Sequence, residues 1–573
     1  MAVIQTQLDF GIESGDGGNP VDVPDLTAVG ESKGVVFTKP WVVNLILDLA
    51  GYRADLDLAS LYAVEPSAGE GAFLLPMIRR LLDSMEAHGR TISEAAGALH
   101  AYELEGTTAE RMKVAAVREL CERGASAAEA RNIATSWLTV GDYLLESPSD
   151  RRADFVVGNP PYIRYDDLGP GMFSSYQRLY PTMIGRCDIY VGFIEAGLHQ
   201  LSDGGVLAFI CADRWMRSAY GGDLRALVTR RFGVEVVIEM HDAPAFENDV
   251  AAYPAVIVIR KAPQGVALVA TADSTSGRPQ TEGSLANAVV ELSCGRGKRI
   301  EGFTASRLDR WFDGGGPWPS LEPERLKVLQ TLEDRHRTLE DLTTGTKVGI
   351  GVATGADKVF VTTDPSLVEP DRLLPLAMSA DTKSGHLHWS GHYLVNPWAK
   401  SGGLADLDAY PRLGAYFEAN RDHLIRRNIA KRQSSNWYRT IDRVRYGLTS
   451  EQKLYFPDMK LTSNPVLDRG ETYPHHNLYF VRSTVWDLEV LGGLLMSKVA
   501  ELFIEAYCVK MRGGTLRFQA QYLRRVRVPD PGSLSIELSE RLRAAFLLRD
   551  FEGANQAAAE AYGIADRMEA IAC

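Results

Sequence analysis

The chain has 573 residues, of which 45% are hydrophobic and 24% are charged, a composition typical of a globular protein with more than one domain. Its net charge of −12 excludes a uniformly basic nucleic-acid-binding protein, but local basic surfaces remain possible because charge is screened over short distances. The six cysteines form no Cys-x-x-Cys pair and no Cys/His cluster with zinc-ligand spacing, so we expect no disulfide framework and no metal site.

The first 33 residues are rich in Gly and Asp, and we expect a flexible tail there. They contain neither a basic start nor an apolar run, so we expect no signal peptide. The sequence has no apolar stretch of 18 residues, so we expect no spanning helix and no membrane partner. Scattered thiols also favour a reducing compartment, and a cytoplasmic location is expected.

From residue 34 to residue 265, apolar runs typical of strands alternate with stretches typical of helices. Strands are expected at 61–64, 98–103, 155–158, 205–211, 234–239 and 255–260, and helices at 41–50, 72–82, 109–123, 189–201 and 223–232. This alternation predicts an α/β fold with a doubly wound, mostly parallel sheet. Ligands of such sheets bind outside the carboxyl ends of the strands, so the residues that follow the strands are the candidates for function.

The first candidate is the turn from Glu65 to Gly71, which follows an expected strand and opens a helix. Its glycines, Gly69 and Gly71, allow the backbone to approach a ligand closely. The spacing is not the Gly-x-Gly-x-x-Gly pattern of dinucleotide sites. An acid at the strand end suits a cationic or amino-bearing ligand, although such a turn by itself can simply be a tight turn.

Two further acids follow the next expected strands. Glu103 could accept hydrogen bonds from ribose hydroxyls, and Asp142 could accept one from an adenine amino group. Each acid alone could equally be a surface acid or a helix cap. Their regular order after the glycine turn favours a binding site.

The strongest signal is Asn159-Pro160-Pro161-Tyr162, directly after the apolar run 155–158. The two prolines stiffen the loop. The Asn159 side-chain oxygen and the Pro160 carbonyl can accept both hydrogens of an amino group on an aromatic ring, which turns the nitrogen lone pair outward. Tyr162 can stack on that ring. The alternative is a proline-stiffened loop without chemistry.

Beyond the sheet we expect a connector at 266–335, a separate domain at 336–531 and a helical segment at 532–573. Residues 419–460 contain ten Lys/Arg and four Asp/Glu, and residues 510–527 contain six Lys/Arg and no acid. Such local excess of positive charge favours phosphate binding, although solvated helix faces would give the same composition. In these two basic segments the expected DNA contacts are Arg426, Arg427, Trp437, Lys460, Arg512 and Arg517.

Together these motifs resemble the amino-methylating DNA methyltransferases, most closely the gamma-type adenine-N6 group that includes the TaqI methylase. The segment 34–40 resembles the N-terminal cofactor motif of that group, with Lys39 where a proline is usual. Asn159 to Tyr162 resembles its catalytic motif, and 348–360 and 510–519 resemble the two ends of its recognition domain. The resemblance implies a class I (Rossmann-like) methyltransferase fold at 34–265 and a mixed α+β DNA recognition domain at 336–531.

The resemblance also implies the site residues and the ligands. S-adenosyl-L-methionine would be the cofactor, bound by Thr38, Glu65, Pro66, Ser67, Gly69, Gly71, Glu103, Asp142, Tyr143 and Pro161. The catalytic residues would be Asn159, Pro160, Tyr162 and Phe246, with the target adenine docked between the two aromatic rings. Double-stranded DNA would be the substrate, and a separate restriction endonuclease could act on the same site.

Three alternatives remain open from the sequence. The Asn-Pro-Pro-Tyr motif also serves methyltransferases of protein glutamine and of RNA guanine, although those chains are usually shorter. Enzymes that methylate the 4-amino group of cytosine use a similar pocket, typically with Ser in place of Asn159. A non-catalytic DNA specificity subunit with a methylase fold is the third alternative.

Overall fold

The computed structural model describes residues 36–146, 151–248, 253–277, 284–295, 300–508 and 515–572. The chain divides into two compact units. The first unit contains Met1–Trp215, Tyr220–Leu227 and Ala245–Ala252, and the second contains Met216–Ala219, Val228–Pro244 and Tyr253–Cys573. Within the described ranges, no helix is both long and apolar enough to cross a membrane.

The first unit is built on five parallel strands that follow the hydrogen-bonded order β3-β2-β1-β4-β5. They are β1 (Ala63–Glu65), β2 (Leu99–Glu103), β3 (Leu138–Val140), β4 (Ala153–Gly158) and β5 (Leu201–Ala212). Since parallel strands end at one edge of a sheet, the residues at or just after the ends of β1 to β4 share that edge. The sequence predicted β1, β2, β4 and β5 to within a few residues, whereas the strand expected before Asp142 was given no range and is the short strand β3.

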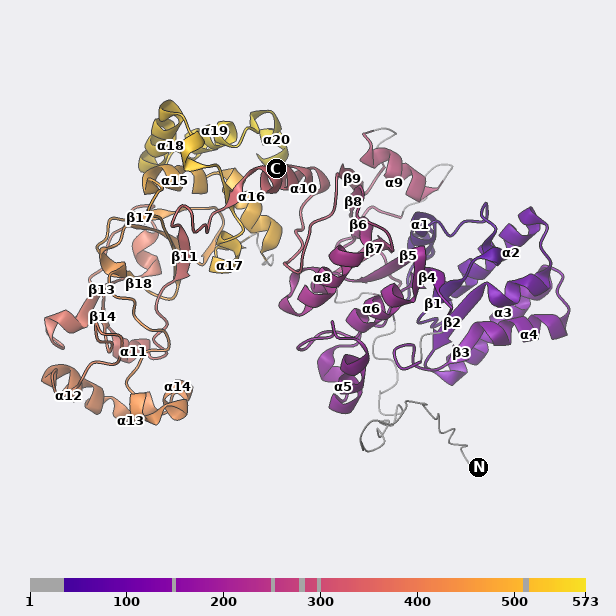
Figure 1. Cartoon of the computed structure of the whole chain (residues 1–573), viewed down its shortest axis with the longest axis horizontal. Coiled ribbons are helices and arrows are strands. Elements are labelled where there is room, and N and C mark those ends of the chain that lie inside the picture. The colour runs from indigo at the N-terminus through magenta and orange to yellow at the C-terminus, as the bar shows by residue number, and fades with distance from the viewer. Residues whose placement is uncertain are drawn as a thin grey trace. The chain divides into compact units, whose positions relative to one another are not determined.

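Helices cover both faces of these strands. The helices of this unit are α1 (Pro40–Ala50), α2 (Leu74–His88), α3 (Gly106–Glu122), α4 (Ala127–Trp137), α5 (Pro170–Leu179) and α6 (Tyr190–Gln200). Helices α1 and α6 both pack on β4 and β5, and they lie on opposite sides of these strands in Figure 1. Helix α1 begins with Pro40, whose fixed φ suits a first helical position, and it ends at Gly51 with φ +82°.

The second unit contributes β6 (Gly233–Glu239), β7 (Pro254–Arg260), β8 (Ala267–Ala272) and β9 (Phe303–Leu308). Strand β6 is antiparallel to β7 and parallel to β8. The whole sheet has the strand order β3-β2-β1-β4-β5-β7-β6-β8-β9. This order confirms the doubly wound, mostly parallel fold class, and its first seven strands have the class I methyltransferase topology.

Residues 266–335, expected to form a connector, contain two strands of the sheet and one long helix. Strands β8 and β9 pair antiparallel along their whole length, and α10 (Pro323–Arg335) follows them. The small and hydroxyl side chains that suggested a loop serve here as strand residues, since Thr271 and Thr304 bond each other across the pair at 2.5 Å.

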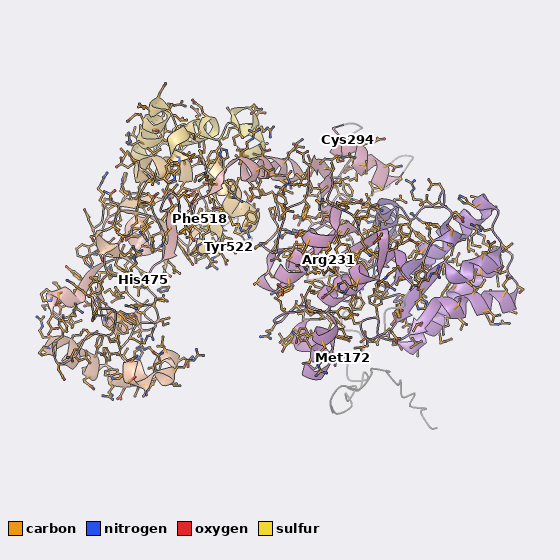
Figure 2. The ribbon with its side chains drawn as sticks, in the orientation of Figure 1. Met172, Arg231, Cys294, His475, Phe518 and Tyr522 are labelled. Atoms are coloured by element: carbon orange, nitrogen blue, oxygen red, sulfur yellow. The ribbon has the colours of Figure 1, made fainter. Side chains whose placement is uncertain are left out.

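The C-terminal part of the second unit has mixed α+β structure, and we call its residues 336–531 the recognition half after the role expected from the sequence. One sheet has the order β11-β19-β15-β17 and another the order β12-β14-β13-β18. Their bounds are Lys347–Ile350 (β11), Val361–Thr362 (β12), Leu373–Ala377 (β13), Tyr393–Val395 (β14), Lys453–Pro457 (β15), Val466–Asp468 (β17), Tyr473–Pro474 (β18) and Leu478–Arg482 (β19). Phe360, Leu376 and Phe417 lie in the core that these sheets share. A two-stranded ribbon pairs β16 (Met459–Lys460) with β20 (Leu516–Arg517), and the adjoining Phe518, labelled in Figure 2, stacks on Phe456.

A buried ion pair lies between β15 and β17. Lys453 and Asp468 are both fully buried, with Nζ 2.7 Å from Oδ2. The ammonium also donates to the carbonyls of Leu448 and Glu451, each at 2.8 Å. The carboxylate also accepts from the Tyr455 hydroxyl at 3.0 Å. This pair is fully integrated into a network, which is the condition for a stable buried ion pair.

The helical segment expected after residue 532 is present as α18 (Ile536–Leu548), α19 (Phe551–Ala561) and α20 (Met568–Ala572). Helix α18 packs on α15 (Leu488–Leu495). A Cβ atom on Gly493 would lie 2.4 Å from the Leu542 carbonyl oxygen, so only glycine permits this close helix crossing.

Candidate active site

The side chain of Asn159 is oriented by the N-terminal segment 36–39. Its Nδ2 donates to the Val36 carbonyl at 3.2 Å and to the Thr38 hydroxyl at 3.1 Å. A carbonyl can only accept, so the amide nitrogen must face Val36, and the amide cannot be flipped. The oxygen Oδ1 therefore faces the other way, where it is buried and has no hydrogen-bond partner among the described residues.

The same segment also positions Phe246. Phe37 accepts from the Glu247 backbone and Lys39 donates to the Ala245 carbonyl, both at 2.9 Å. Thr38 and Phe246 form an antiparallel bridge between these two bonds. The Thr38 side chain, expected to contact a cofactor carboxylate, thus also accepts a hydrogen bond from Asn159, the expected catalytic residue.

Tyr162 and Phe246 lie beside each other, as expected for two aromatic residues of one pocket. Their ring centroids are 6.1 Å apart and the planes meet at 82°, so the rings contact edge to face. A base that docks between them must separate them first. The Tyr162 hydroxyl points inward, where it is buried without a hydrogen-bond partner in the described chain, and this burial raises the pKa of the phenol well above its usual value. Of the other loop residues, Pro160 is buried and Pro161 is half-buried.

Glu65 is a buried acid at the end of β1 with an unpartnered atom. The residue is 1% exposed, and its Oε2 has no partner among the described residues. Burial, and then the charge of Glu103, raise the pKa of the Glu65 carboxyl well above its ordinary value. A buried carboxyl without partners costs free energy unless a ligand donates to it, so this atom suits a ligand that carries an ammonium group.

The glycine turn after Glu65 is held in place by its neighbours. The Gly69 backbone donates to Glu103 Oε2 at 2.7 Å. Gly71 has φ +84°, and a Cβ atom there would lie 2.4 Å from the Met112 sulfur, so the turn needs glycine at this position. Pro66 is buried and Ser67 is half-buried, and the residues predicted from the sequence thus form one short, fixed loop.

Glu103 and Asp142 lie at the same edge of the sheet as Glu65, and the protein already uses part of their bonding capacity. Glu103 accepts from two backbone N–H groups, of Gly69 and Glu105. Asp142 accepts from the Leu144 backbone at 2.9 Å and from the Tyr176 hydroxyl at 2.5 Å. Burial raises the pKa of the Asp142 carboxyl, and the bond from Tyr176 opposes that rise. Each carboxylate oxygen can accept a second hydrogen bond.

The structure places two tyrosines near Asp142, Tyr143 and Tyr176. Tyr143, an expected cofactor contact, is 7% exposed, and its hydroxyl donates to Gln200 at 3.0 Å. Tyr176, which sequence reasoning missed, comes from α5 and bonds the carboxylate of Asp142. No local pattern could have identified it, because the two residues are 34 positions apart.

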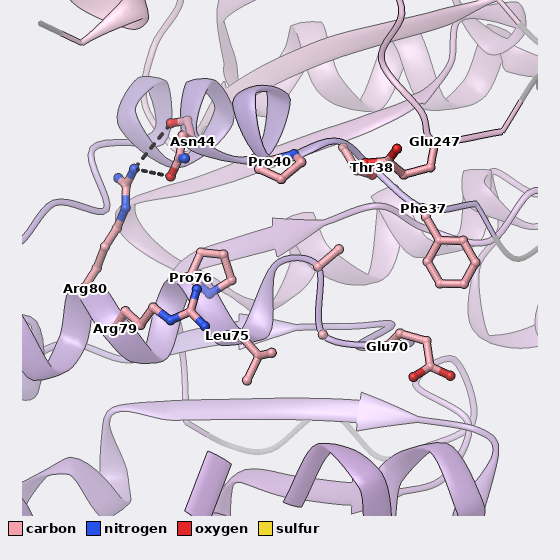
Figure 3. A pocket seen from close by; sticks show the side chains of 12 residues that line it. Phe37, Thr38, Pro40, Asn44, Glu70, Leu75, Pro76, Arg79, Arg80 and Glu247 are labelled. Atoms are coloured by element: carbon pink, nitrogen blue, oxygen red, sulfur yellow. Dashed lines mark hydrogen bonds between the residues drawn. The ribbon is translucent and has the colours of Figure 1, made fainter. Parts of the chain in front are cut away.

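A cavity of about 550 Å³ opens beside the glycine turn (Figure 3). It shares only Thr38 and Gly71 with the predicted cofactor residues, and Glu65, Glu103 and Asp142 do not line it. Arg80 on its wall donates to the Asn44 side chain at 3.1 Å and pairs with Asp48. The cavity therefore adjoins the predicted site and does not coincide with it.

The expected DNA contacts of the recognition half fall into different environments. Arg427 donates to the carbonyls of Thr354, Trp437 and Arg439 at 2.8–3.0 Å, so its guanidinium is committed to the fold. Arg426 is exposed. Adjacent arginines thus have opposite roles: one holds loops together, and the other faces solvent.

The remaining candidates for DNA contacts also lie in different environments. Trp437 is 8% exposed, under the guanidinium of Arg421 at 4.9 Å. Arg517 pairs with Asp458 through its Nε at 3.0 Å, and the half-buried Lys460 lies on the neighbouring strand of the ribbon. Arg512 lies outside the described residues. The buried position of Trp437 and the bonds of Arg427 favour structural roles for both, which leaves Arg426 and Lys460 as the stronger candidates.

Comparison with known proteins shows the family to which the chain is related. Residues 91–246 match the Eco57I restriction-modification methylase family. Over 538 residues the chain is 43% identical to the type II methyltransferase M.PaeR7I of Pseudomonas aeruginosa, covering 93% of this chain and 92% of that protein. It is 39% identical over 540 residues to the type II methyltransferase M.XhoI of Xanthomonas vasicola, covering 93% and 98%. Among solved structures, the type IIL restriction-modification enzyme MmeI in complex with DNA aligns with a TM-score of 0.49 at 12% identity, covering 93% of this chain and 75% of that one.

Proposed function

The chain belongs to the type II restriction-modification methyltransferases, and from this premise we propose that it transfers a methyl group from S-adenosyl-L-methionine to the 6-amino group of adenine in duplex DNA. Its biological role would be the modification enzyme of a bacterial restriction-modification system. A separate endonuclease would cut the same site when it is unmethylated. Both enzymes would act on DNA in the cytoplasm.

The orientation of the Asn159 side chain is the observation that carries this proposal. Its Nδ2 is occupied by Val36 and Thr38, and its Oδ1 is buried without a partner among the described residues. A buried acceptor is rarely left unpaired unless something outside the chain donates to it. An aromatic amino group is such a donor. Adenine is preferred over cytosine because cytosine-methylating relatives of this motif typically have Ser at the position of Asn159.

The residues at the edge of the sheet fit the proposed cofactor. Glu65 offers an unpartnered carboxylate oxygen to the ammonium of the methionine moiety. Glu103 and Asp142 retain acceptor capacity for ribose hydroxyls and for an adenine amino group, and the turn at Gly69 and Gly71 allows close approach. When bound, S-adenosyl-L-methionine supplies an electrophilic methyl group on a sulfonium.

The chain itself contributes mainly positioning. A target base inside a duplex cannot be reached, so it must leave the stack. Asn159 Oδ1 and the Pro160 carbonyl would accept the two amino hydrogens, which draws the nitrogen lone pair out of conjugation and directs it outward. Tyr162 and Phe246 would hold the plane of the base. No strong general base is needed because the proton can leave after transfer, and positioning of this kind can contribute roughly 7–11 kcal/mol.

The test is direct incubation of the purified chain with unmethylated bacterial DNA and radiolabelled S-adenosyl-L-methionine, followed by nucleoside analysis. We expect labelled 6-methyladenine with the wild type and none with Asn159→Ala. Label in cytosine, RNA or protein would overturn the choice of substrate. Cofactor binding with no labelled product would favour the non-catalytic specificity subunit.

A further inference from the structure

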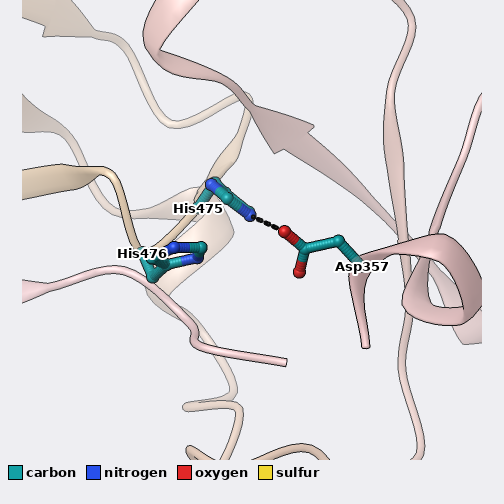
Figure 4. Close-up of side chains that lie close together, drawn as sticks. All are labelled: Asp357, His475 and His476. Atoms are coloured by element: carbon teal, nitrogen blue, oxygen red, sulfur yellow. Dashed lines mark hydrogen bonds and ion pairs between the residues drawn. The ribbon is translucent and has the colours of Figure 1, made fainter. Parts of the chain in front are cut away.

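A second group of unpartnered polar atoms lies in the recognition half, remote in sequence from the methyltransferase motifs. Asp357 begins α11 (Asp357–Phe360), and His475 and His476 directly follow β18. His475 Nε2 lies 3.1 Å from Asp357 Oδ2, as the dashed line in Figure 4 shows. One ligand-capable atom from each residue lies within 4.8 Å of the other two. Three potential metal ligands therefore converge on one point.

The backbone holds these three side chains together without help from a ligand. Val352 donates to the Pro474 carbonyl at 2.9 Å, and His476 donates back to the Val352 carbonyl at 3.1 Å. A Cβ atom on Gly351 would lie 2.2 Å from the His475 carbonyl oxygen, so the two segments touch where only glycine fits. The site is thus preorganised by the fold.

The hydrogen bond between His475 and Asp357 does not explain why all three side chains lie together. His475 is 1% exposed, and the Nδ1 atoms of His475 and His476 are both buried with no partner among the described residues. Each unpaired buried nitrogen costs free energy. The hydrogen bond uses one nitrogen of His475 and none of His476, so the convergence of His476 on the other two residues remains unexplained by it.

We propose that Asp357, His475 and His476 bind a divalent transition-metal ion, with zinc as the expected ion. Two imidazoles and one carboxylate suit zinc, with water in a fourth position. Magnesium and calcium prefer oxygen ligands and are not expected to bind. The ion would join the first residue of α11 to the residues directly after β18, and so would stabilise the recognition half without entering the methyl-transfer reaction.

This site is independent of the proposed function and is contrary to the expectation from the sequence of no metal site. Asp357 and His475 are 118 positions apart, so no spacing pattern connects them. Only the fold brings the third ligand to the His-His pair.

The test is zinc titration of the full-length chain after treatment with a chelator, followed by calorimetry. We expect one saturable site per chain, and an affinity that falls by more than about tenfold in His476→Ala and in Asp357→Asn, since even outer-sphere partners of a metal are worth that much. His423→Ala is the matched control, because His423 is exposed on α13 (Arg421–Ile425) of the same half. Zinc should raise the unfolding temperature of the wild type and of the control, and not of the two site variants.

Cobalt substitution separates this site from adventitious binding by the thiols. Cobalt bound to imidazole and carboxylate should give visible ligand-field bands without a thiolate charge-transfer band. Absence of saturable zinc binding, wild-type affinity in both site variants, or a thiolate band would each overturn the proposal. Asp357→Asn keeps the size of the side chain, so a folding defect confined to His476→Ala would still leave the comparison with the wild type.

Discussion

The edge of the sheet that carries the proposed active site and the β15–β17 region of the recognition half bury polar groups in opposite ways. At the proposed active site, Glu65 and Asn159 each leave an oxygen without a partner among the described residues. Between β15 and β17, Lys453 and Asp468 are more deeply buried, yet each has several partners. Burial of polar groups is therefore no indication of function by itself. The difference is whether the bonding capacity is used within the chain or left for a ligand.

The largest expected effect comes from breaking the hydrogen-bonded network around Lys453 and Asp468. Lys453→Met leaves Asp468 buried without its ammonium partner, and we expect the free energy of unfolding to fall by about 3–5 kcal/mol. Urea unfolding followed by tryptophan fluorescence measures it. Lys431→Met, at an exposed lysine on α14 (Asn428–Arg432), should change stability by less than about 0.5 kcal/mol. Equal changes in the free energy of unfolding for the two substitutions would mean that the buried ion pair stabilises the chain no more than an exposed lysine does.

Removal of the unpaired acceptor should affect activity far more than stability. Asn159→Ala removes Oδ1, and we expect the methylation rate to fall by about 10²–10³-fold, as for the loss of one preorganised transition-state contact. Cofactor affinity, measured by calorimetry, should stay close to that of the wild type. Asn159→Asp keeps acceptor oxygens but cannot donate to Val36, so it tests the orientation. Wild-type activity in Asn159→Asp would show that the bonds to Val36 and Thr38 are dispensable.

Arg427 and Arg426 of the recognition half show the same difference between a group bonded within the chain and a group that faces solvent, and the expected effects of their substitution are smaller. Arg427→Ala leaves the carbonyls of Thr354, Trp437 and Arg439 without their donor, so we expect a loss of about 1–3 kcal/mol in unfolding free energy. The same urea experiment measures it. A stable Arg427→Ala variant with weakened DNA binding would instead indicate that Arg427 contacts DNA.

The pH dependence of cofactor binding sharpens the comparison at Glu65. The pKa of Glu65 is raised in the folded chain, so the ligand-free chain holds the proton to a higher pH than the unfolded chain does. The contribution of Glu65 to the free energy of unfolding therefore falls as the pH rises from the ordinary pKa of a glutamate to the raised pKa. The cofactor ammonium needs the ionised form. Cofactor affinity should therefore increase by up to about tenfold per pH unit below the raised pKa, and Glu65→Gln should bind more weakly with that dependence removed. Calorimetry over a pH series gives both, and an unchanged slope in Glu65→Gln would assign the titration to another group.

The smallest expected effect is at Arg426. Arg426→Ala should leave stability unchanged and should reduce the slope of log affinity for DNA against log salt by about 1, as for the loss of one phosphate contact. Fluorescence anisotropy with duplex DNA at several salt concentrations measures the slope. An unchanged slope would exclude a phosphate contact at this residue.

Sequence analysis predicted the parts of the fold that depend on local pattern. The parallel strands and the positions of Glu65, Glu103 and Asn159 at their ends follow from apolar runs and from the residues directly behind them. The strands β8 and β9 were missed because small and hydroxyl residues such as Thr271 are also typical of loops. Such residues form strands here because a neighbouring strand of the sheet offers hydrogen-bond partners to their backbone.

Contacts between distant residues could not be predicted. Nothing near Asp142 in the sequence indicates that Tyr176 bonds it, and nothing near Asp357 indicates His475. Arg426 and Arg427 are indistinguishable in sequence, and only the packing of the loops around Trp437 separates the exposed guanidinium from the one that binds carbonyls.

The hydrogen bonds between segments 36–39 and 245–247 also set the order in which the site can form during translation. The first segment leaves the ribosome about 200 residues before the second, which corresponds to roughly 10–40 s at 5–20 residues per second. Until Ala245 and Glu247 emerge, Phe37 and Lys39 lack the partners that fix them beside Asn159. A nascent chain that already contains the whole Asn-Pro-Pro-Tyr motif therefore still lacks the backbone hydrogen bonds that hold segment 36–39 beside Asn159.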